Sequence, residues 1–223
     1  MLRINILLIV FTVVSITLVR GQKAKPFEGV IIYEIKIEGD DLDPMAKSMF
    51  SNMEQTMCLK KEKSRSESDF GFSKSITISD SKTGSVVTLS EIMGQKFMIK
   101  LTPEDLAKQD KMGEEIKINY LDETKVIAGY TCKKALVISP DSPDPMIVFY
   151  TTDIPATPYV TPFKGIAGLP LEYDGNMGGI KMKTTVKSIK SEKVPNTQFD
   201  IPEGYQETTV EELQNMFEGG IEE

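Results

Sequence analysis

The sequence contains no histidine. Without this residue neither a Ser-His-Asp triad nor a Cys-His pair can form, and the usual zinc sites lose their common nitrogen ligand. The chain also lacks the GxGxxG, P-loop and GxSxG patterns, which mark phosphate-cradling loops and the serine nucleophile elbow. We therefore expect no catalytic residues, no cofactor and no enzymatic activity.

Tryptophan is absent as well, and aromatic residues make up 8% of the chain. Paired carboxylates can hydrolyse glycosides, but so few aromatic residues disfavour a sugar-binding cleft. Two acidic groups, Asp40-Asp41-Asp43 and Asp141 with Asp144, could offer oxygen ligands to calcium. The first lacks EF-hand spacing and the second lies among prolines. We interpret both as turn or helix-cap residues and expect no metal site.

The sequence has no basic excess, because 26 lysines and arginines face 33 acidic residues and give a net charge of −7. The two signs are interspersed along the chain. An acidic, mixed surface argues against nucleic-acid binding, and no polybasic patch is available for anionic membranes. We expect a monomer in solution.

The one long apolar run lies at the N-terminus, where Ile6 to Val19 follows the positive charge of Arg3. This run is shorter than the ~20 residues that a membrane-spanning helix needs. Small residues before Gln22 are typical of a signal-peptidase site. We interpret residues 1–21 as a secretory signal peptide cleaved near Gly21/Gln22, with a transmembrane anchor as the alternative. Residues 22–223 then form a single domain in a periplasmic or secreted protein.

Only two cysteines are present, Cys58 and Cys132. In an exported protein an even count favours a disulfide, and two cysteines allow one intramolecular pairing. The alternative is two buried free thiols, because each cysteine lies in or near a predicted strand.

Alternation of apolar and polar residues predicts many short strands. In the first of them Tyr33, Ile35 and Ile37 alternate with charged residues, which is the pattern of a strand with one buried face. The predicted strands are 29–38, 58–69, 75–79, 85–89, 96–101, 116–120, 125–128, 131–138, 146–151, 169–173 and 180–191. About ten strands with closely spaced turns predict a mainly β (α+β) fold with one strongly curved antiparallel sheet or a half-open β-barrel.

Two or three helices are expected to cover the concave face of this sheet, from three predicted helical segments. The first begins at Asp43-Pro44 and carries methionines at every fourth position through Met57. The second begins at Thr102 and runs to about Gln109, and the third spans 209–218 behind a capping box. Because methionine suits surfaces that accept varied apolar partners, the first helix is either a plain core element or a lid over a cavity. The cavity candidates are Tyr33, Ile35, Met45, Met49, Phe50, Met53, Phe97 and Phe149.

Four segments together resemble a known family. Thr124 to Ala135 resembles a K-x-I-x-G-Y-x-C-K-K-A segment, and Phe149 to Ile154 is similar to W-Y-T-x-D-I with Phe149 in place of the tryptophan. Gly168 to Tyr173 resembles G-L-P-L-E-Y, and Phe199 to Tyr205 resembles F-x-I-P-x-G-Y. These motifs belong to exported bacterial proteins of domain of unknown function 4412.

This resemblance implies no catalytic residues. It implies a fold similar to the lipoprotein carriers LolA and LolB, in which helices cover a curved half-barrel around an apolar cavity. We expect an exported binding protein that holds a lipid, a lipoprotein acyl chain or another apolar ligand between the sheet and the methionine-rich helix. The alternative is a structural or interaction module of the cell envelope, with a packed core and a protein partner.

Overall fold

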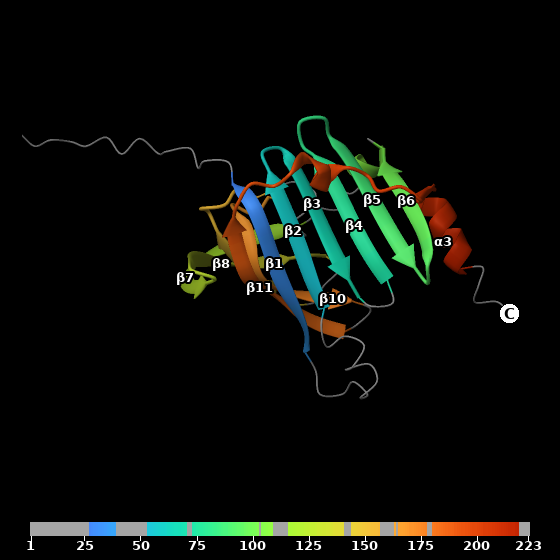
Figure 1. Cartoon of the computed structure of the whole chain (residues 1–223). Coiled ribbons are helices and arrows are strands. Elements are labelled where there is room, and N and C mark those ends of the chain that lie inside the picture. Colours follow the sequence, from blue (N-terminus) through green and yellow to red (C-terminus); the bar gives the residue numbers. More distant parts are fainter. Residues whose placement is uncertain are drawn as a thin grey trace, which may run out of the picture.

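The computed structural model describes residues 27–38, 53–70, 73–102, 104–108, 116–140, 144–156, 163, 165–177 and 180–218. This part of the chain is mostly β and forms one large, curved, open sheet (Figure 1). The strands are β1 Glu28–Glu38, β2 Met53–Lys60, β3 Lys63–Asp69, β4 Ser73–Asp80, β5 Ser85–Ile92, β6 Gln95–Leu101, β7 Lys117–Ile127, β8 Tyr130–Ile138, β9 Met146–Thr151, β10 Leu169–Met177, β11 Ile180–Ser191 and β12 Gln206–Glu207. None of the described helices is both long and apolar enough to span a membrane.

The order of the strands is β12-β6-β5-β4-β3-β2-β1-β11-β10-β9-β8-β7. All neighbours are antiparallel except β12 and β6, which are parallel. β1 lies in the middle of the sheet, paired with β2 on one side and with β11 on the other. The alternation predicted for this strand is confirmed, because Ile31 and Tyr33 are buried while Lys36 and Glu38 are exposed.

The segment 58–69, predicted as one strand, is two strands of a hairpin. The chain reverses at Lys61-Glu62, where Lys61 adopts a positive φ of 53°. β2 and β3 then pair antiparallel, with Cys58 opposite Arg65. The prediction was wrong here because the turn contains neither glycine nor proline, the residues that normally mark a reversal.

The predicted helix over Asp43–Met57 is wrong at its C-terminal end. Met53 and Met57 belong to strand β2, and both are buried. A spacing of four residues fits the helical period of 3.6, but it is also a multiple of the strand period of two. The two methionines therefore share one face in either structure. Met45, Met49 and Phe50 lie outside the described residues.

Apolar side chains of the sheet gather in three clusters. The first joins β1 and β2 to strands β7–β11 and the turn after β9, and contains Ile31, Tyr33, Met57, Leu59, Ile127, Cys132, Phe149, Ile154, Leu169, Leu171 and Val186. The third lies at the β7–β9 end and contains Ala135, Val137, Val148, Tyr150, Phe163 and Ile166. In the first cluster the buried hydroxyl of Tyr33 donates a hydrogen bond to the Pro170 carbonyl at 3.0 Å. Burial raises the pKa of this phenol well above its usual value.

The second cluster lies under the C-terminal segment, which crosses the opposite face of β1–β6 as a strap over residues 192–209 (Figure 1). Val194 and Phe199 of the strap pack against Cys58, Ile76, Ile78 and Leu89. At its start the Val194 amide donates to Glu28 Oε1 at 2.9 Å, and Lys60 Nζ donates to the Val194 carbonyl at 2.5 Å. Both faces of this half of the sheet therefore carry buried side chains.

Three helical segments are described, and they do not form the predicted cover. A turn of helix spans 104–108, a 3-10 helix (η1) spans Asn196–Phe199 within the strap, and α3 spans Val210–Glu218. α3 lies beside β6 at the end of the sheet, away from β1 (Figure 1). Its Thr209–Glu212 capping box is present, with Glu212 accepting from the Thr209 amide at 3.0 Å and donating its own amide to Thr209 Oγ1 at 3.1 Å.

Candidate functional site

The two edge strands of the sheet, β6 and β7, differ in how far the chain itself covers their outer sides. At the β6 edge, β12 adds a short parallel strand that pairs Gln206 with Phe97 and Glu207 with Met98. The Thr208 amide continues this pairing by donating to the Met98 carbonyl at 2.9 Å. The strap thus covers part of this edge with the chain's own backbone, which is one way that proteins protect exposed strands.

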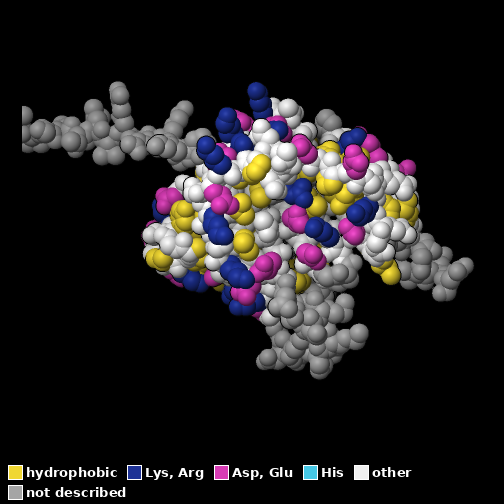
Figure 2. All heavy atoms as spheres, in the orientation of Figure 1, with side chains coloured by type: hydrophobic (Ala, Val, Ile, Leu, Met, Phe, Trp, Pro, Cys, Tyr) yellow, Lys and Arg dark blue, Asp and Glu magenta, His cyan; other side chains and the backbone are white. Residues whose placement is uncertain are grey.

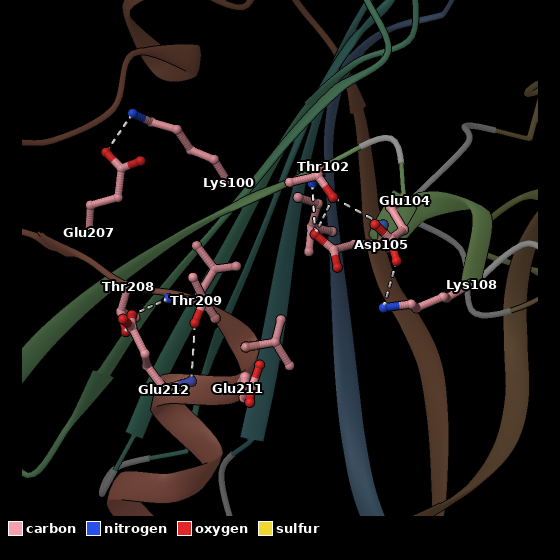
Figure 3. A pocket seen from close by; sticks show the side chains of 13 residues that line it. Lys100, Thr102, Glu104, Asp105, Lys108, Glu207, Thr208, Thr209, Glu211 and Glu212 are labelled. Atoms are coloured by element: carbon pink, nitrogen blue, oxygen red, sulfur yellow. Dashed lines mark hydrogen bonds and ion pairs between the residues drawn. The ribbon is translucent and has the colours of Figure 1, made fainter.

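A groove of about 720 Å³ opens where the strap meets β6 (Figure 3). Its walls come from the end of β6, the helical turn after it, and the start of α3. Both lysines that line it are paired, Lys100 with Glu207 at 2.6 Å and Lys108 with Glu104 at 3.3 Å. Among its described lining residues, the groove therefore offers no lysine without an acidic partner.

Two capping carboxylates also line this groove. Hydrogen bonds from the side chain and then the amide of Thr102 lower the pKa of Asp105. Donation from the Thr209 amide and then the Thr208 hydroxyl lowers the pKa of Glu212. Each carboxylate is thus ionised and engaged at its own helix N-terminus, which is the arrangement of a structural cap.

The opposite edge belongs to β7, whose outer side has no partner strand in the described part of the chain. Most of its residues are exposed, and three of them are large and apolar. Tyr120, Leu121 and Val126 expose 49%, 39% and 69% of their surface. Figure 2 shows hydrophobic side chains reaching the surface among charged ones at the end of the molecule formed by β7 and β8. An unpaired strand with exposed apolar side chains can accept a further strand.

The first half of this edge is fixed to the core through Tyr120. Its ring packs edge-to-face on Tyr150, with centroids 5.6 Å apart, and its hydroxyl donates to the Gly165 carbonyl at 3.3 Å. Ile118 packs against the third cluster beside it. The backbone of Lys117–Leu121 is therefore held in an extended conformation before any partner arrives.

The second half is held by a cluster of charges around one ring, called here the Phe149 clasp: Lys125, Lys134, Phe149, Glu123 and Glu172. Lys125 Nζ and Lys134 Nζ lie 5.3 and 5.8 Å from the centre of the Phe149 ring, within the range of cation–π attraction. The same ammonium groups bind Glu172 at 2.7 Å and Glu123 at 2.8 Å. The clasp ties β7 to β10 across two intervening strands.

A bulge interrupts the edge between these halves. Leu121 pairs with Lys134 and Thr124 with Lys133, so Asp122 and Glu123 have no opposite residues in β8. Bulges and charged side chains limit uncontrolled pairing at an edge. The free edge therefore consists of two short runs, Lys117–Leu121 and Thr124–Ile127.

On the side of the sheet that carries Met53 and Met57, the side chains change from apolar to hydroxyl-bearing at β3. Register places Ser66 opposite Met57 and Ser64 opposite Leu59, and the next strand continues with Ser79 and Thr77. Ser64 and Ser79 share a 2.5 Å hydrogen bond. Hydroxyl groups thus interrupt the apolar surface on this side at β3 and β4, a change that the S-x-S-x-S spacing after Lys63 signals in the sequence. Buried apolar residues resume beyond them, with Val86 opposite Ser79 and Ile99 opposite Thr88.

The predicted cavity residues take different positions. Tyr33 and Phe149 belong to the first cluster, Met53 and Phe97 are buried outside the three clusters, and Ile35 is half-buried. Phe149 contacts the clasp lysines, so its surroundings are partly charged.

The predicted Cys58–Cys132 disulfide is absent, because both cysteines are free and buried. Cys58 lies in β2 and Cys132 in β8, with four strands between them in the sheet. They belong to different clusters, whereas a disulfide needs Cα atoms within roughly 7 Å. Burial raises the pKa of both thiols, that of Cys132 to about 11.

Tyr120, Leu121 and Val126 were not among the predicted site residues. Tyr120 and Val126 fall in the predicted strands 116–120 and 125–128, which the structure joins into the single strand β7. Which strand ends a sheet follows from the pairing of all the others. Among the described residues no group of three or more acidic or cysteine side chains could hold a metal ion. No buried polar side-chain atom there lacks a hydrogen-bond partner.

No protein-family model matches the chain, and no curated protein matches it. Among solved structures, PNGF-II in space group P21 superposes with a TM-score of 0.56 at 18% identity, over 85% of this chain and 33% of that one. The same protein in space group C2 gives 0.54 at 17% identity, over 85% and 32%. MucB in complex with MucA(peri) gives 0.40 at 12% identity, over 82% and 57%. The chain thus spans about a third of the length of PNGF-II and shares its fold in that part.

Proposed function

We propose that this protein is an exported, non-enzymatic binding module that engages a protein partner through the open edge of β7. The observation that carries the proposal is the difference between the two sheet edges. One edge is partly covered by β12, whereas the other presents a strand without a partner in the described structure, with Tyr120, Leu121 and Val126 at the surface. Main-chain hydrogen bonds to such an edge supply affinity, and adjacent side chains supply specificity.

The anchoring of β7 supports this function. The Tyr120–Tyr150 contact and the Phe149 clasp fix both halves of the strand to the sheet. A partner would therefore meet an edge that is already ordered, which reduces the entropy lost on binding. The sequence has no histidine, and both lysines of the groove are held in ion pairs. These two features fit a binding role better than a catalytic one.

Photo-crosslinking in the exporting cells tests this function. A photoreactive residue replaces Val126 on the edge, and in the control it replaces Met93, which is 90% exposed in the turn between β5 and β6. We expect one protein, identified by mass spectrometry, to crosslink from position 126 and not from position 93. Identical products from both positions, or no product from position 126, would contradict the proposal.

A second candidate function is transport of a lipid or another apolar ligand. It is favoured by Met53 and Met57, which are buried on the same side of the sheet as Ile31 and Tyr33. In this proposal the domain works as a LolA- or LolB-like carrier, as the resemblance to domain of unknown function 4412 implies, with the ligand held against the side of the sheet that carries Met53 and Met57. Native mass spectrometry of protein purified from the exporting compartment tests it. A bound mass that is lost after delipidation supports the carrier, and a ligand-free protein argues against it.

A further inference from the structure

The chemistry around β7 indicates what kind of segment this edge would accept. Across β7 and β8, residues 117–138 contain four lysines and two acidic residues. The chain as a whole has a net charge of −7. β7 and β8 together are therefore locally basic in an acidic protein, while β7 itself holds two lysines and two acidic residues. The excess comes from the lysines of β8, beside which a partner with the opposite charge would be favoured.

Pairing within the Phe149 clasp leaves two other lysines near the two ends of the first run, Lys117–Leu121. Lys125 and Lys134 bind Glu172 and Glu123. Lys117 begins the strand, and Lys133 lies opposite Thr124 in the second run. Neither of these two lysines has an acidic partner among the described residues, and both are exposed. The bulge between them holds two acidic residues, Asp122 and Glu123, of which Glu123 is paired with Lys134.

Apolar side chains lie between those lysines on both sides of the strand. On one side Tyr120 lies opposite Ala135, beside the third cluster. On the other side Leu121 lies opposite Lys134, and the row of Asn119 continues with Leu136 and Ile147 in β8 and β9. A strand added along Lys117–Leu121 would thus meet apolar side chains between Lys117 at one end and Lys133 beyond the bulge at the other.

We infer that the β7 edge binds an extended segment of a partner protein, with apolar residues at its centre and acidic residues at both ends. This inference rests on the proposed function and specifies the partner's chemistry. Backbone pairing along Lys117–Leu121 provides the affinity, and Lys117 and Lys133 select the acidic ends. The bulge at Asp122-Glu123 limits the paired length to a short segment.

Three synthetic peptides test the inference against the full chain. They share a core of alternating Val and Thr and differ only in their flanks, which are Glu, Ser or Lys at both ends. Affinity is measured by fluorescence anisotropy at low and high salt. We expect the Glu-flanked peptide to bind about tenfold more tightly than the Lys-flanked one, and salt to reduce this difference.

Matched variants locate the binding. The double substitution Lys117→Glu and Lys133→Glu should reverse the order of the Glu- and Lys-flanked peptides. Leu121→Lys places a charge on the edge and should abolish binding of all three, while Met93→Lys makes the same kind of change in an exposed turn and should leave binding unchanged. Circular dichroism confirms that each variant is folded.

The outcomes separate this inference from the proposed function. Equal affinity for the three peptides, lost in Leu121→Lys, would overturn the acidic-partner inference and leave edge pairing in place. Binding that Leu121→Lys does not affect, or no binding by any peptide, would overturn both. Dimerisation of the chain alone in sedimentation velocity, dissolved by Leu121→Lys, would assign the edge to a second copy and would also overturn the inference.

Discussion

Lys125 Nζ lies 2.8 and 2.7 Å from the two carboxylate oxygens of Glu172, although 47 residues separate them in the chain. The Glu172 side chain is only 12% exposed, while that of Lys125 is 46% exposed. Thr185 Oγ1 lies 3.5 Å from the same carboxylate. This contact joins the edge strand to β10, and it connects the stability of the sheet with the geometry of the proposed binding edge.

Lys125→Met should therefore destabilise the protein by about 1–3 kcal/mol, because it leaves a largely buried carboxylate without its cation. The matched control is Lys100→Met, which removes the Lys100–Glu207 pair. Both of its side chains are more than half exposed, so its loss should cost less than about 1 kcal/mol. Urea unfolding of the two variants measures the difference. Equal losses of unfolding free energy in the two variants would show that the Phe149 clasp adds no more stability than an exposed ion pair.

Gly168→Ala should disrupt the junction of β9 and β10. A Cβ at this position would lie 2.0 Å from the Thr151 carbonyl oxygen and 2.7 Å from its carbon. Both atoms belong to the backbone, so the strands must separate, at a cost of about 1–3 kcal/mol or more. Gly84→Ala is the control, since its Cβ meets nothing within 4 Å and only its positive φ of 71° is strained. That strain should cost about 1 kcal/mol. Thermal unfolding measures the loss of stability in both variants. A smaller loss of stability in Gly168→Ala than in Gly84→Ala would contradict this packing.

Both cysteines should remain reduced and protected in the native protein. Burial is the largest cause of the raised pKa of each thiol, and that of Cys132 reaches about 11. At pH 8 a thiol-specific reagent should modify neither residue until the protein is unfolded, and then it should modify both. The intact mass of the protein after labelling gives the number of modified cysteines. A single disulfide in the purified protein would contradict the free, separated thiols.

The same shift predicts a loss of stability at alkaline pH. The folded protein holds the Cys132 thiol in its neutral form, whereas the unfolded chain releases the proton near the ordinary pKa of 9. The stabilising effect is therefore complete below about pH 9 and is lost progressively as pH rises to about 11. Unfolding midpoints of the wild type and Cys132→Ala should converge over this range. A constant difference between them would rule out this linkage.

Local patterns in the sequence predicted many of the strands, because alternation directly reports a half-buried strand. This held for β1, where Tyr33 and Lys36 point to opposite sides, and for β11 and β9, whose predicted bounds match the structure. It failed where a pattern fits two structures. The four-residue spacing of Met53 and Met57 suits a helix and a strand equally, and the turn at Lys61 contains no glycine.

Relationships between distant strands were not accessible from sequence. Whether Cys58 can reach Cys132 depends on the four strands between them. The exposure of Tyr120 and Val126 follows from the terminal position of β7 in the sheet, which no local pattern encodes. Similarly, the packing of Phe199 in the strap against Cys58 is a long-range contact that no local pattern encodes.

Hydrogen–deuterium exchange across β7 tests the central claim most directly. In the full chain alone, outward-facing amides of Lys117–Leu121 should exchange rapidly, because they have no partner strand in the described structure. Saturation with the Glu-flanked peptide should slow exchange in this run and leave β2 unchanged, and Leu121→Lys should abolish the protection. Protection that appears in β2 around Met53 and Met57 instead, with β7 unchanged, would contradict edge binding and favour a ligand on the apolar side of the sheet.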